Sequence, residues 1–378
     1  MSHPASPESS LHDQLTLALI AGIGPRLRAA LLAEFTTPRR VLAASPTDLS
    51  RVPGVGPQLC RQITAARRQI DPQAELALCQ QHGIEVLTSA APCYPRLLQE
   101  IVDPPGVLFT QGTLLPTDSL TIAIVGARQA SRYGVQQAER LATGLTQAGL
   151  TIVSGMARGI DAAAHRGALR AGGRTIAVLG SGLLQIYPPE HRDLALEIAQ
   201  SGALISEMPP RCPPFRGAFP QRNRIVTGIS LGVLVIEAGI RSGALISANQ
   251  ASEQGREVFA MPGRVDSRVS QGCHRLIRDG AKLVESVDDV LEELGPLVES
   301  VTSIHGKRVN HPAELQLNEQ EQAVLSAIDA DPTRIEDIIS TSQLPVHRVL
   351  STLSVLEMRH LIQRRGGTLV SRKTSVTG

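Results

Sequence analysis

The segment between residues 150 and 171 constrains the fold of this chain more than any other. The apolar run Leu150–Val153 predicts a buried strand, Ser154–Asp161 a glycine-rich loop, and 162–171 a helix. Glycine lets a backbone approach an anion closely, and a helix N-terminus offers unpaired N–H groups and the positive end of its dipole. Arg158 adds a positive charge to the loop. This segment therefore predicts an anion site in an α/β fold.

The same alternation of apolar runs and amphipathic stretches continues from about residue 71 to 295. The predicted strands are Ile84–Thr88, Val107–Gln111, Thr121–Gly126, Leu150–Ser154, Thr175–Gly180, Ala203–Ser206, Val233–Glu237 and Glu257–Ala260. Continuous Val/Ile/Leu strands separated by helices indicate a mostly parallel sheet covered on both faces. A ligand would then bind at the carboxyl ends of the strands.

Residues 10–70 predict a separate helical module. Gly-Ile-Gly at 22–24 and Pro-Gly-Val-Gly at 53–56 each precede a helical run, Pro25–Phe35 and 57–68. This tandem pattern resembles a helix-hairpin-helix module, which aims backbone N–H groups at a phosphate without reading bases. The segment holds eight arginines against three acidic residues, which favours nucleic acid as the ligand. A module that only packs against the rest of the fold is the alternative.

A turn-rich stretch at 296–314 predicts a linker, and residues 315–373 predict a last domain. Its helices are expected at 318–329, 333–341 and 345–359, with Asn318 and Thr333 as N-caps. A hairpin over 361–370 would turn at Gly366-Gly367. Three helices and a basic hairpin resemble a winged helix. Acidic residues on the first two helices favour a protein contact or weak DNA binding for this domain.

Composition limits the compartment and the kind of ligand. Three of the 37 basic residues are lysine, so 34 are arginine, the cation suited to bidentate phosphate contacts. A GC-rich genome would give the same bias. The five cysteines include no C-x-x-C pair, the start of the chain is polar, and no apolar run reaches membrane length. We therefore expect a cytoplasmic protein with no membrane insertion, no metal and no cofactor.

Several predicted strands end in polar clusters that would meet at one edge of the sheet. The arginines at these ends are Arg128, Arg158, Arg222, Arg224 and Arg241. Five guanidinium groups with backbone N–H groups would form a groove for an extended phosphate chain. The nearby aromatic residues that could stack on bases are Tyr133, Tyr187, Phe215 and Phe219.

Three polar residues beside this edge allow a catalytic or a structural interpretation. Asp161, His165 and Glu237 could act as acid/base or metal-binding groups, but the chain has no H-x-E, H-E-x-x-H, P-loop or G-x-G-x-x-G spacing. Alternatively, Asp161 holds the loop, His165 is a satisfied buried histidine, and Glu207 and Glu237 pair with Arg222 or Arg224. We favour the structural interpretation.

Taken in order, the motifs resemble those of the DNA-processing protein A (DprA, or Smf) family. They are Ile124–Arg128, Ser154–Asp161 with Ala164-His165, Phe219–Arg224, Val235–Ala238, Ser242-Gly243 and Pro262-Gly263. The resemblance covers essentially the whole chain. It implies a Rossmann-like core flanked by a helix-hairpin-helix (SAM-like) module and a winged helix. It also implies a non-enzymatic recombination mediator that protects single-stranded DNA and helps to load RecA during natural transformation, and that forms a homodimer.

The family motifs assign the DNA contacts to specific residues of this chain. The implied contacts are Gly126, Arg128, Ser154, Gly155, Arg158, Gly159, Arg222, Asn223, Arg224, Ser242 and Gly243, supported by Asp161, His165 and Glu237. One position departs from the pattern. A lysine often follows the Tyr-Pro pair in the family, whereas Pro189 and Glu190 follow it here, and Arg192 or Arg211 would have to substitute.

Two other functions compete with DNA binding. A Rossmann-like hydrolase of nucleoside monophosphates has a similar layout but carries a P-G-G-x-G-T-x-x-E loop, and the corresponding region here reads EAGIRSGA (237–244). A scaffold that works through its winged helix is the third possibility. Which partner the winged helix binds, the size of the oligomer, the surfaces for RecA and the competence of the source organism stay open.

Overall fold

The computed structural model of this chain describes residues 7–294, 301–302, 308–309, 319–329, 331–358, 361–364 and 369–372. Six helices come first: α1 (Pro7–Leu19), α2 (Pro25–Phe35), α3 (Pro38–Ala43), α4 (Pro46–Leu49), α5 (Pro57–Gln69) and α6 (Pro72–Gln81). Each begins with proline, whose fixed φ and missing N–H suit the first helical turn. Leu17, Leu31 and Ile63 belong to an apolar cluster of this module's own. The two predicted helices after the glycine turns are confirmed as α2 and α5.

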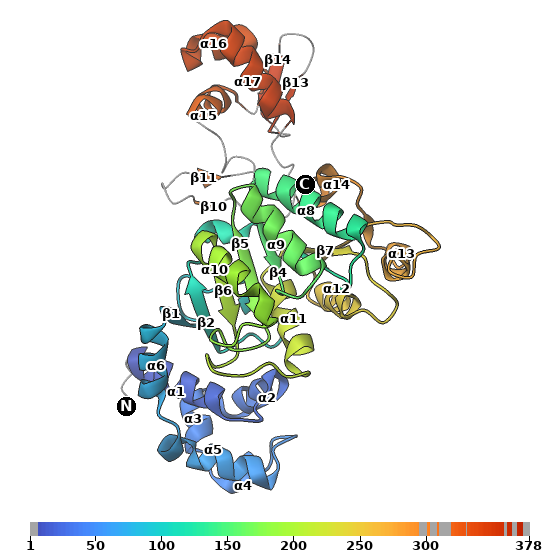
Figure 1. The fold of residues 1–378 in the computed structure, drawn as a ribbon. Coiled ribbons are helices and arrows are strands. Elements are labelled where there is room, and N and C mark those ends of the chain that lie inside the picture. The colour runs from blue at the N-terminus through green and yellow to red at the C-terminus, as the bar shows by residue number, and fades with distance from the viewer. Residues whose placement is uncertain are drawn as a thin grey trace.

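A β-sheet with helices around it forms the centre of the molecule (Figure 1). The sheet has nine strands in the order β1-β2-β6-β5-β4-β3-β7-β8-β9. Its strands are β1 (Ile84–Thr88), β2 (Val107–Gly112), β3 (Thr121–Gly126), β4 (Thr151–Ser154), β5 (Thr175–Leu179), β6 (Ala203–Ser206), β7 (Gly232–Ile236), β8 (Glu257–Ala260) and β9 (Lys282–Leu283). The neighbours from β6 to β9 pair in parallel, and β2 pairs antiparallel with β1 and β6. All eight predicted strands are present. The ninth, β9, has two exposed residues and no apolar run to reveal it.

Helices cover both faces of the sheet. One face carries α8 (Arg132–Gln147), α9 (Ile160–Arg170), α10 (Arg192–Ser201) and α14 (Val287–Leu294). The other carries α7 (Arg96–Gln99), α11 (Ala218–Gly228), α12 (Gly243–Glu253) and α13 (Gln271–Arg278). In β5, Ile176 and Val178 pack toward α11, whereas Ala177 and Leu179 pack toward α9 and α10. Side chains on both faces are therefore buried, which explains the unbroken apolar strands.

The order of the strands locates the ligand-binding edge. From β3 the chain adds β4, β5 and β6 on one side, and then returns to place β7 on the other side of β3. In open α/β sheets, ligands bind outside the carboxyl ends of the strands at such a reversal. The carboxyl ends of β3 and β7 therefore mark the expected site.

The C-terminal domain has its own small core. It contains α15 (Glu319–Ser326), β12 (Thr333–Arg334), α16 (Ile335–Ser342), α17 (Val346–Met358), β13 (Ile362–Arg364) and β14 (Leu369–Arg372). The strands form an antiparallel sheet in the order β12-β14-β13. Val324, Ile338 and Leu353 are fully buried in the domain's apolar cluster. The three predicted helices and the hairpin strands are confirmed.

Two details near this domain correct or qualify the sequence predictions. Thr333 is not an N-cap, because it pairs with Val370 in β12 while Arg334 precedes α16. The hydroxyl of Thr333 instead accepts a hydrogen bond from the N–H of Asp329. The pair of two-residue strands β10 (Val301–Thr302) and β11 (Arg308–Val309) lies within the predicted linker. Asn318, the turn at 366–367 and the rest of the linker lie outside the described residues.

Candidate nucleic-acid interface

A groove of about 870 Å³ opens where β3 and β7 end. It lies between the loop after β3 and the first turns of α11 and α12. Of the site residues predicted from the sequence, seven line it, and so does Arg241 of the predicted rim. The seven are Gly126, Arg128, Asp161, Arg222, Asn223, Ser242 and Gly243.

The backbone at the groove is held tightly by the two strand ends. The N–H of Ala127 donates to the carbonyl of Glu237 at 2.7 Å, and that of Ile160 donates to the carbonyl of Ala127 at 3.3 Å. Gly159 has a φ of +75°, and a side chain there would overlap the carbonyl of Ala127. The glycine at 159 is therefore required for packing against the β3 loop, and the residue does not itself line the groove.

Three exposed arginines supply the positive charge of the groove. Arg128, Arg216 and Arg241 line it, and none of them has an ion-pair partner among the described residues. The guanidinium carbon of Arg128 lies 5.2 Å from the centre of the Phe219 ring, within the range of a cation–π contact. Arg216 was not among the residues predicted from the sequence. The one feature of the sequence that could have indicated Arg216 is its position, as a basic residue in the turn-rich stretch just before the Phe219–Arg224 motif.

Aromatic rings extend one wall of the groove. Tyr187 and Phe219 both line it, with ring centroids 5.7 Å apart and planes inclined by 49°. The exposed ring of Phe215 lies outside the groove, and Tyr133 lines a second hollow. Unpaired guanidinium groups beside aromatic faces are suited to a single strand, because they bind its phosphates and stack on its bases.

Arg222 forms the buried base of the groove. Its Nη1 donates to the carbonyl of Val178, and its side chain fills the space that a Cβ at Gly155 would need. Burial lowers the pKa of Arg222 to about 10, which the nearby Asp161 carboxylate opposes. The guanidinium therefore supports the floor of the groove.

Asp161 organises the glycine-rich loop at 154–161. Its Oδ2 accepts hydrogen bonds from the N–H groups of Gly155 at 3.1 Å and Ala157 at 3.2 Å. Burial raises the pKa of this carboxyl, while Arg222 and the two N–H donors act in the opposite direction. The sequence predicted that the N–H groups of this loop bind an external anion. Two of them instead donate to the protein's own Asp161 carboxylate.

Arg224 faces away from the groove, which corrects the predicted rim. Its side chain is 6% exposed, and its Nη2 lies 2.7 and 2.6 Å from the carboxylate oxygens of Glu207. Its Nε lies 3.4 Å from Asp103. Residues two apart on a helix point in different directions, so Arg222 and Arg224 of α11 cannot share one surface. The ion pair between Arg224 and Glu207, which was the structural alternative in the sequence analysis, is therefore the arrangement present.

Arg158 and Ser154 also lie outside the groove. The exposed Arg158 pairs with Glu190, the acidic residue that departs from the family pattern. Ser154 is buried, and its hydroxyl donates to the carbonyl of Ile124 at 2.6 Å, which ties β4 to β3. Neither Arg192 nor Arg211, the candidate substitutes for the missing lysine, lines the groove.

Neither His165 nor Glu237 lines the groove, and both side chains are held by hydrogen bonds to neighbouring residues. His165 is fully buried, and its Nδ1 lies 2.7 Å from the hydroxyl of Thr175, which donates onward to the carbonyl of Ile152. Burial, followed by His191 and Arg222, lowers the pKa of His165 to about 3, so the imidazole is neutral. Glu237 accepts hydrogen bonds from the N–H and hydroxyl of Ser131, and it pairs with neither Arg222 nor Arg224.

Two other kinds of site, a metal centre and a membrane span, are not found in the parts of the chain that the structure describes. Within these parts, no group of three or more His, Cys, Asp or Glu side chains is placed to hold a metal ion. None of their helices is both long enough and apolar enough to cross a bilayer.

Comparison with known proteins identifies the family. Residues 85–295 match the family model of DNA recombination-mediator protein A, 310–368 the DprA winged helix domain, and 15–69 the SAM-like helix-hairpin-helix tandem. Protein Smf of Synechocystis sp. is 36% identical over 390 residues, covering 95% of this chain and 98% of the relative. Protein Smf of Escherichia coli is 37% identical over 302 residues, 80% of each chain.

Solved structures agree with this result. The X-ray structure of DprA from Streptococcus pneumoniae has a TM-score of 0.63 and 35% identity, covering 74% of this chain and 95% of that one. A Helicobacter pylori DprA structure, described for its single-stranded DNA binding mode, has a TM-score of 0.51 and 31% identity, covering 56% and 95%. The Rossmann-like core with its helix-hairpin-helix and winged-helix modules is thereby confirmed, and the chain belongs to the DNA-processing protein A (DprA/Smf) family.

Proposed function

We propose that this chain is a single-stranded DNA-binding recombination mediator that works without catalysis. The observation that carries the proposal is the groove in which Arg128, Arg216 and Arg241 are exposed and have no carboxylate partner among the described residues. Unpaired guanidinium groups attract an extended polyanion, and their contacts release counterions from it. The relative from Helicobacter pylori whose structure concerns single-stranded DNA supports the same ligand.

In this proposal the strand backbone follows the carboxyl edge of the sheet. The three exposed arginines contact phosphates. Gly126 and Gly243 let the DNA backbone approach closely, and Asn223 and Ser242 line its path with polar side chains. Arg222 supports the floor without reaching the strand. Arg158 contributes less to DNA binding than these three arginines, because Glu190 neutralises part of its charge.

For the cellular role, we propose what the resemblance to the family implies. The protein protects incoming single strands in the cytoplasm and helps to load RecA recombinase on them during natural transformation, acting as a homodimer. We propose a division into a helical module at 10–70, the core at 71–295, a linker at 296–314 and a winged helix at 315–373. Apolar clusters within the helical module and within the winged helix support it, while Leu15 of α1 packs in a cluster of the core. RecA-dependent strand exchange with and without the protein tests the mediator role, and light scattering tests the dimer.

Arg128→Ala is the direct test of the groove. Losing one charge-assisted contact should weaken binding of a short single strand by about 10- to 100-fold at fixed salt. The slope of log affinity against log salt should become shallower by about 0.7. Arg166→Ala removes an exposed arginine of α9 outside the groove and serves as the matched control.

Unchanged affinity of the Arg128 variant in a gel shift or in fluorescence anisotropy would show that this groove is not the DNA site. A second assay addresses the proposed lack of catalysis: the protein is incubated with AMP, and the solution is examined for free adenine. Release of adenine would contradict a purely DNA-binding role.

A further inference from the structure

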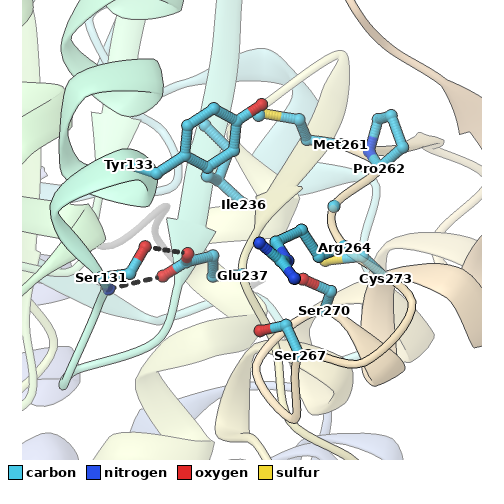
Figure 2. Close-up of a pocket in the computed structure, with 11 residues that line it drawn as sticks. Ser131, Tyr133, Ile236, Glu237, Met261, Pro262, Arg264, Ser267, Ser270 and Cys273 are labelled. Carbon is cyan, nitrogen blue, oxygen red and sulfur yellow. Dashed lines mark hydrogen bonds between the residues drawn. The ribbon is translucent and has the colours of Figure 1, made fainter.

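A second hollow of about 680 Å³ lies next to the groove at the same edge of the sheet. Figure 2 shows the side chains around it, which come from the start of α8, the ends of β7 and β8, and the segment 261–273. Its volume falls in the range of small-molecule sites, which is about 300–1,000 Å³. None of the phosphate-contacting residues predicted from the sequence lines it, whereas the supporting residue Glu237 does, and so does Tyr133, one of the aromatic residues expected to be able to stack on bases.

Most of the surface of this hollow is apolar, and it includes one aromatic face open to solvent. Ile236, Met261 and Cys273 are buried side chains that form its floor. The ring of Tyr133 is 51% exposed, and no hydrogen-bond partner for its hydroxyl exists among the described residues. An exposed planar ring beside an apolar floor is suited to a flat apolar ligand with polar edges, because one face of the ligand stacks while its edge stays hydrated.

The acidic groups at the hollow are already paired. Both oxygens of the Glu237 carboxylate accept hydrogen bonds from Ser131, one from the N–H at 2.7 Å and one from the hydroxyl (Figure 2). Gly134 makes this possible, because a Cβ there would overlap the carboxyl group. Arg264 pairs with Asp266 at 3.0 and 2.9 Å. The carboxylate of Glu237, the acidic group among the residues lining the hollow, is thus held against Ser131 at the start of α8.

The hollow and the groove are lined by neighbouring residues of the same two loops, which follow β3 and β7. Arg128 lines the groove, whereas Ser131 and Tyr133, a few residues further along the same loop and helix, line the hollow. On the opposite side, Glu237 lines the hollow and Gly239 lines the groove. The hydrogen bond from Ala127 N–H to the Glu237 carbonyl joins these two loops. A chain molecule bound in the groove thus passes directly beside the hollow.

We infer that the hollow takes one unstacked base of the strand whose backbone lies in the Arg128 groove. The inference rests on the proposed function and adds a base-stacking position to it. Tyr133 stacks on the base, and the apolar floor accepts any of the four bases, so the position adds affinity without sequence preference.

The test compares two single strands of equal length, one of oligothymidylate and one of abasic sites, which carry the same phosphates. Tyr133→Ala should weaken binding of oligothymidylate about tenfold and of the abasic strand by less than about twofold, as expected for loss of base stacking. Tyr133→Phe, which keeps the ring, should bind both strands like the unaltered protein. Leu196→Ala on α10 removes a large exposed side chain elsewhere and is the control.

The outcomes separate this inference from the groove itself. If Tyr133→Ala weakens both strands equally, or neither, while Arg128→Ala weakens both, the base position is wrong and the groove stands. If Arg128→Ala also weakens neither strand, the groove and the base position are both wrong. Photocrosslinking of a strand containing 5-iododeoxyuridine gives a direct readout, because the adduct should map to Tyr133 or the neighbouring lining residues.

Discussion

Replacing Arg224 by methionine should destabilise the core domain and leave DNA binding intact. Sequence motifs place Arg224 beside the DNA contacts, whereas its guanidinium is buried between Glu207 and Asp103. Methionine keeps much of the length and the apolar volume of the arginine stem and removes the charge. Two partly buried carboxylates then remain without this cation.

The expected cost follows from the burial of the three side chains. Arg224 is 6% exposed, Glu207 16% and Asp103 23%. Removing one partner of a buried ion pair costs about 3–5 kcal/mol, because the other charge is left desolvated and unpaired. We expect about 3 kcal/mol, the lower end, since the carboxylates keep some water and the nearby Arg28 also attracts Glu207. For a domain of about 150–250 residues this corresponds to a melting temperature lower by about 6–12 °C.

Thermal unfolding followed by far-ultraviolet circular dichroism measures this change, since the chain has no tryptophan for intrinsic fluorescence. Arg216→Met is the matched control, because Arg216 is exposed, lines the groove and has no ion pair among the described residues. It should weaken DNA binding and leave the melting temperature unchanged. Adding Glu207→Gln to the Arg224 variant should restore part of the lost stability. An Arg224 variant with an unchanged melting temperature but about tenfold weaker DNA binding would refute the reasoning, because it would make Arg224 a phosphate contact.

Two further predictions concern a buried histidine and an exposed ion pair. The pKa of His165 falls from its ordinary 6.5 to about 3 on folding, so protons bind preferentially to the unfolded chain as the pH drops from 6.5 towards 3. Stability is therefore lost in that window, by about 2 kcal/mol from this residue at pH 5. Denaturant unfolding at pH 7 and pH 5 should show a smaller loss in His165→Gln, and an equal loss in both proteins would contradict this. Glu190→Gln frees Arg158, so single-strand affinity at low salt should rise and its salt slope should steepen by up to about 0.7. An unchanged slope would mean that the strand does not reach Arg158.

Strand positions could be predicted because each buried strand is a short run of apolar residues between turns. Thr121–Gly126, Ala203–Ser206 and Glu257–Ala260 have the same bounds in the structure and in the prediction. The first residues of α2 and α5, Pro25 and Pro57, could also be predicted, because a proline that follows a glycine turn is typical of the first turn of a helix. The N-cap of α16 could not be predicted. Thr333 lies in a two-residue strand, and that strand forms only because β14, which is distant in the sequence, pairs with it.

The set of residues at the groove could be predicted only in part. The positions after β3 and β7 were correctly expected to meet, because parallel strands in this order share one carboxyl edge. Which arginines face the groove was not decided by their nearness in sequence. Arg224 turned out to be buried in an ion pair, while Arg216, in a turn-rich stretch with no motif of its own, faces the groove.

The sequence by itself determined the fold class, the modules and the edge of the sheet where a ligand would bind, because local patterns of apolar residues, glycine and proline carry that information. The tertiary structure alone decided which charges are free. A guanidinium contributes to binding only if no carboxylate from another element reaches it, and the partners of Arg158 and Arg224 come from elsewhere in the chain. The phosphate loop at 154–161 illustrates the difference: its residues look exposed in the sequence, yet folding brings Asp161 onto its N–H groups and leaves the open positive charge to Arg128, Arg216 and Arg241.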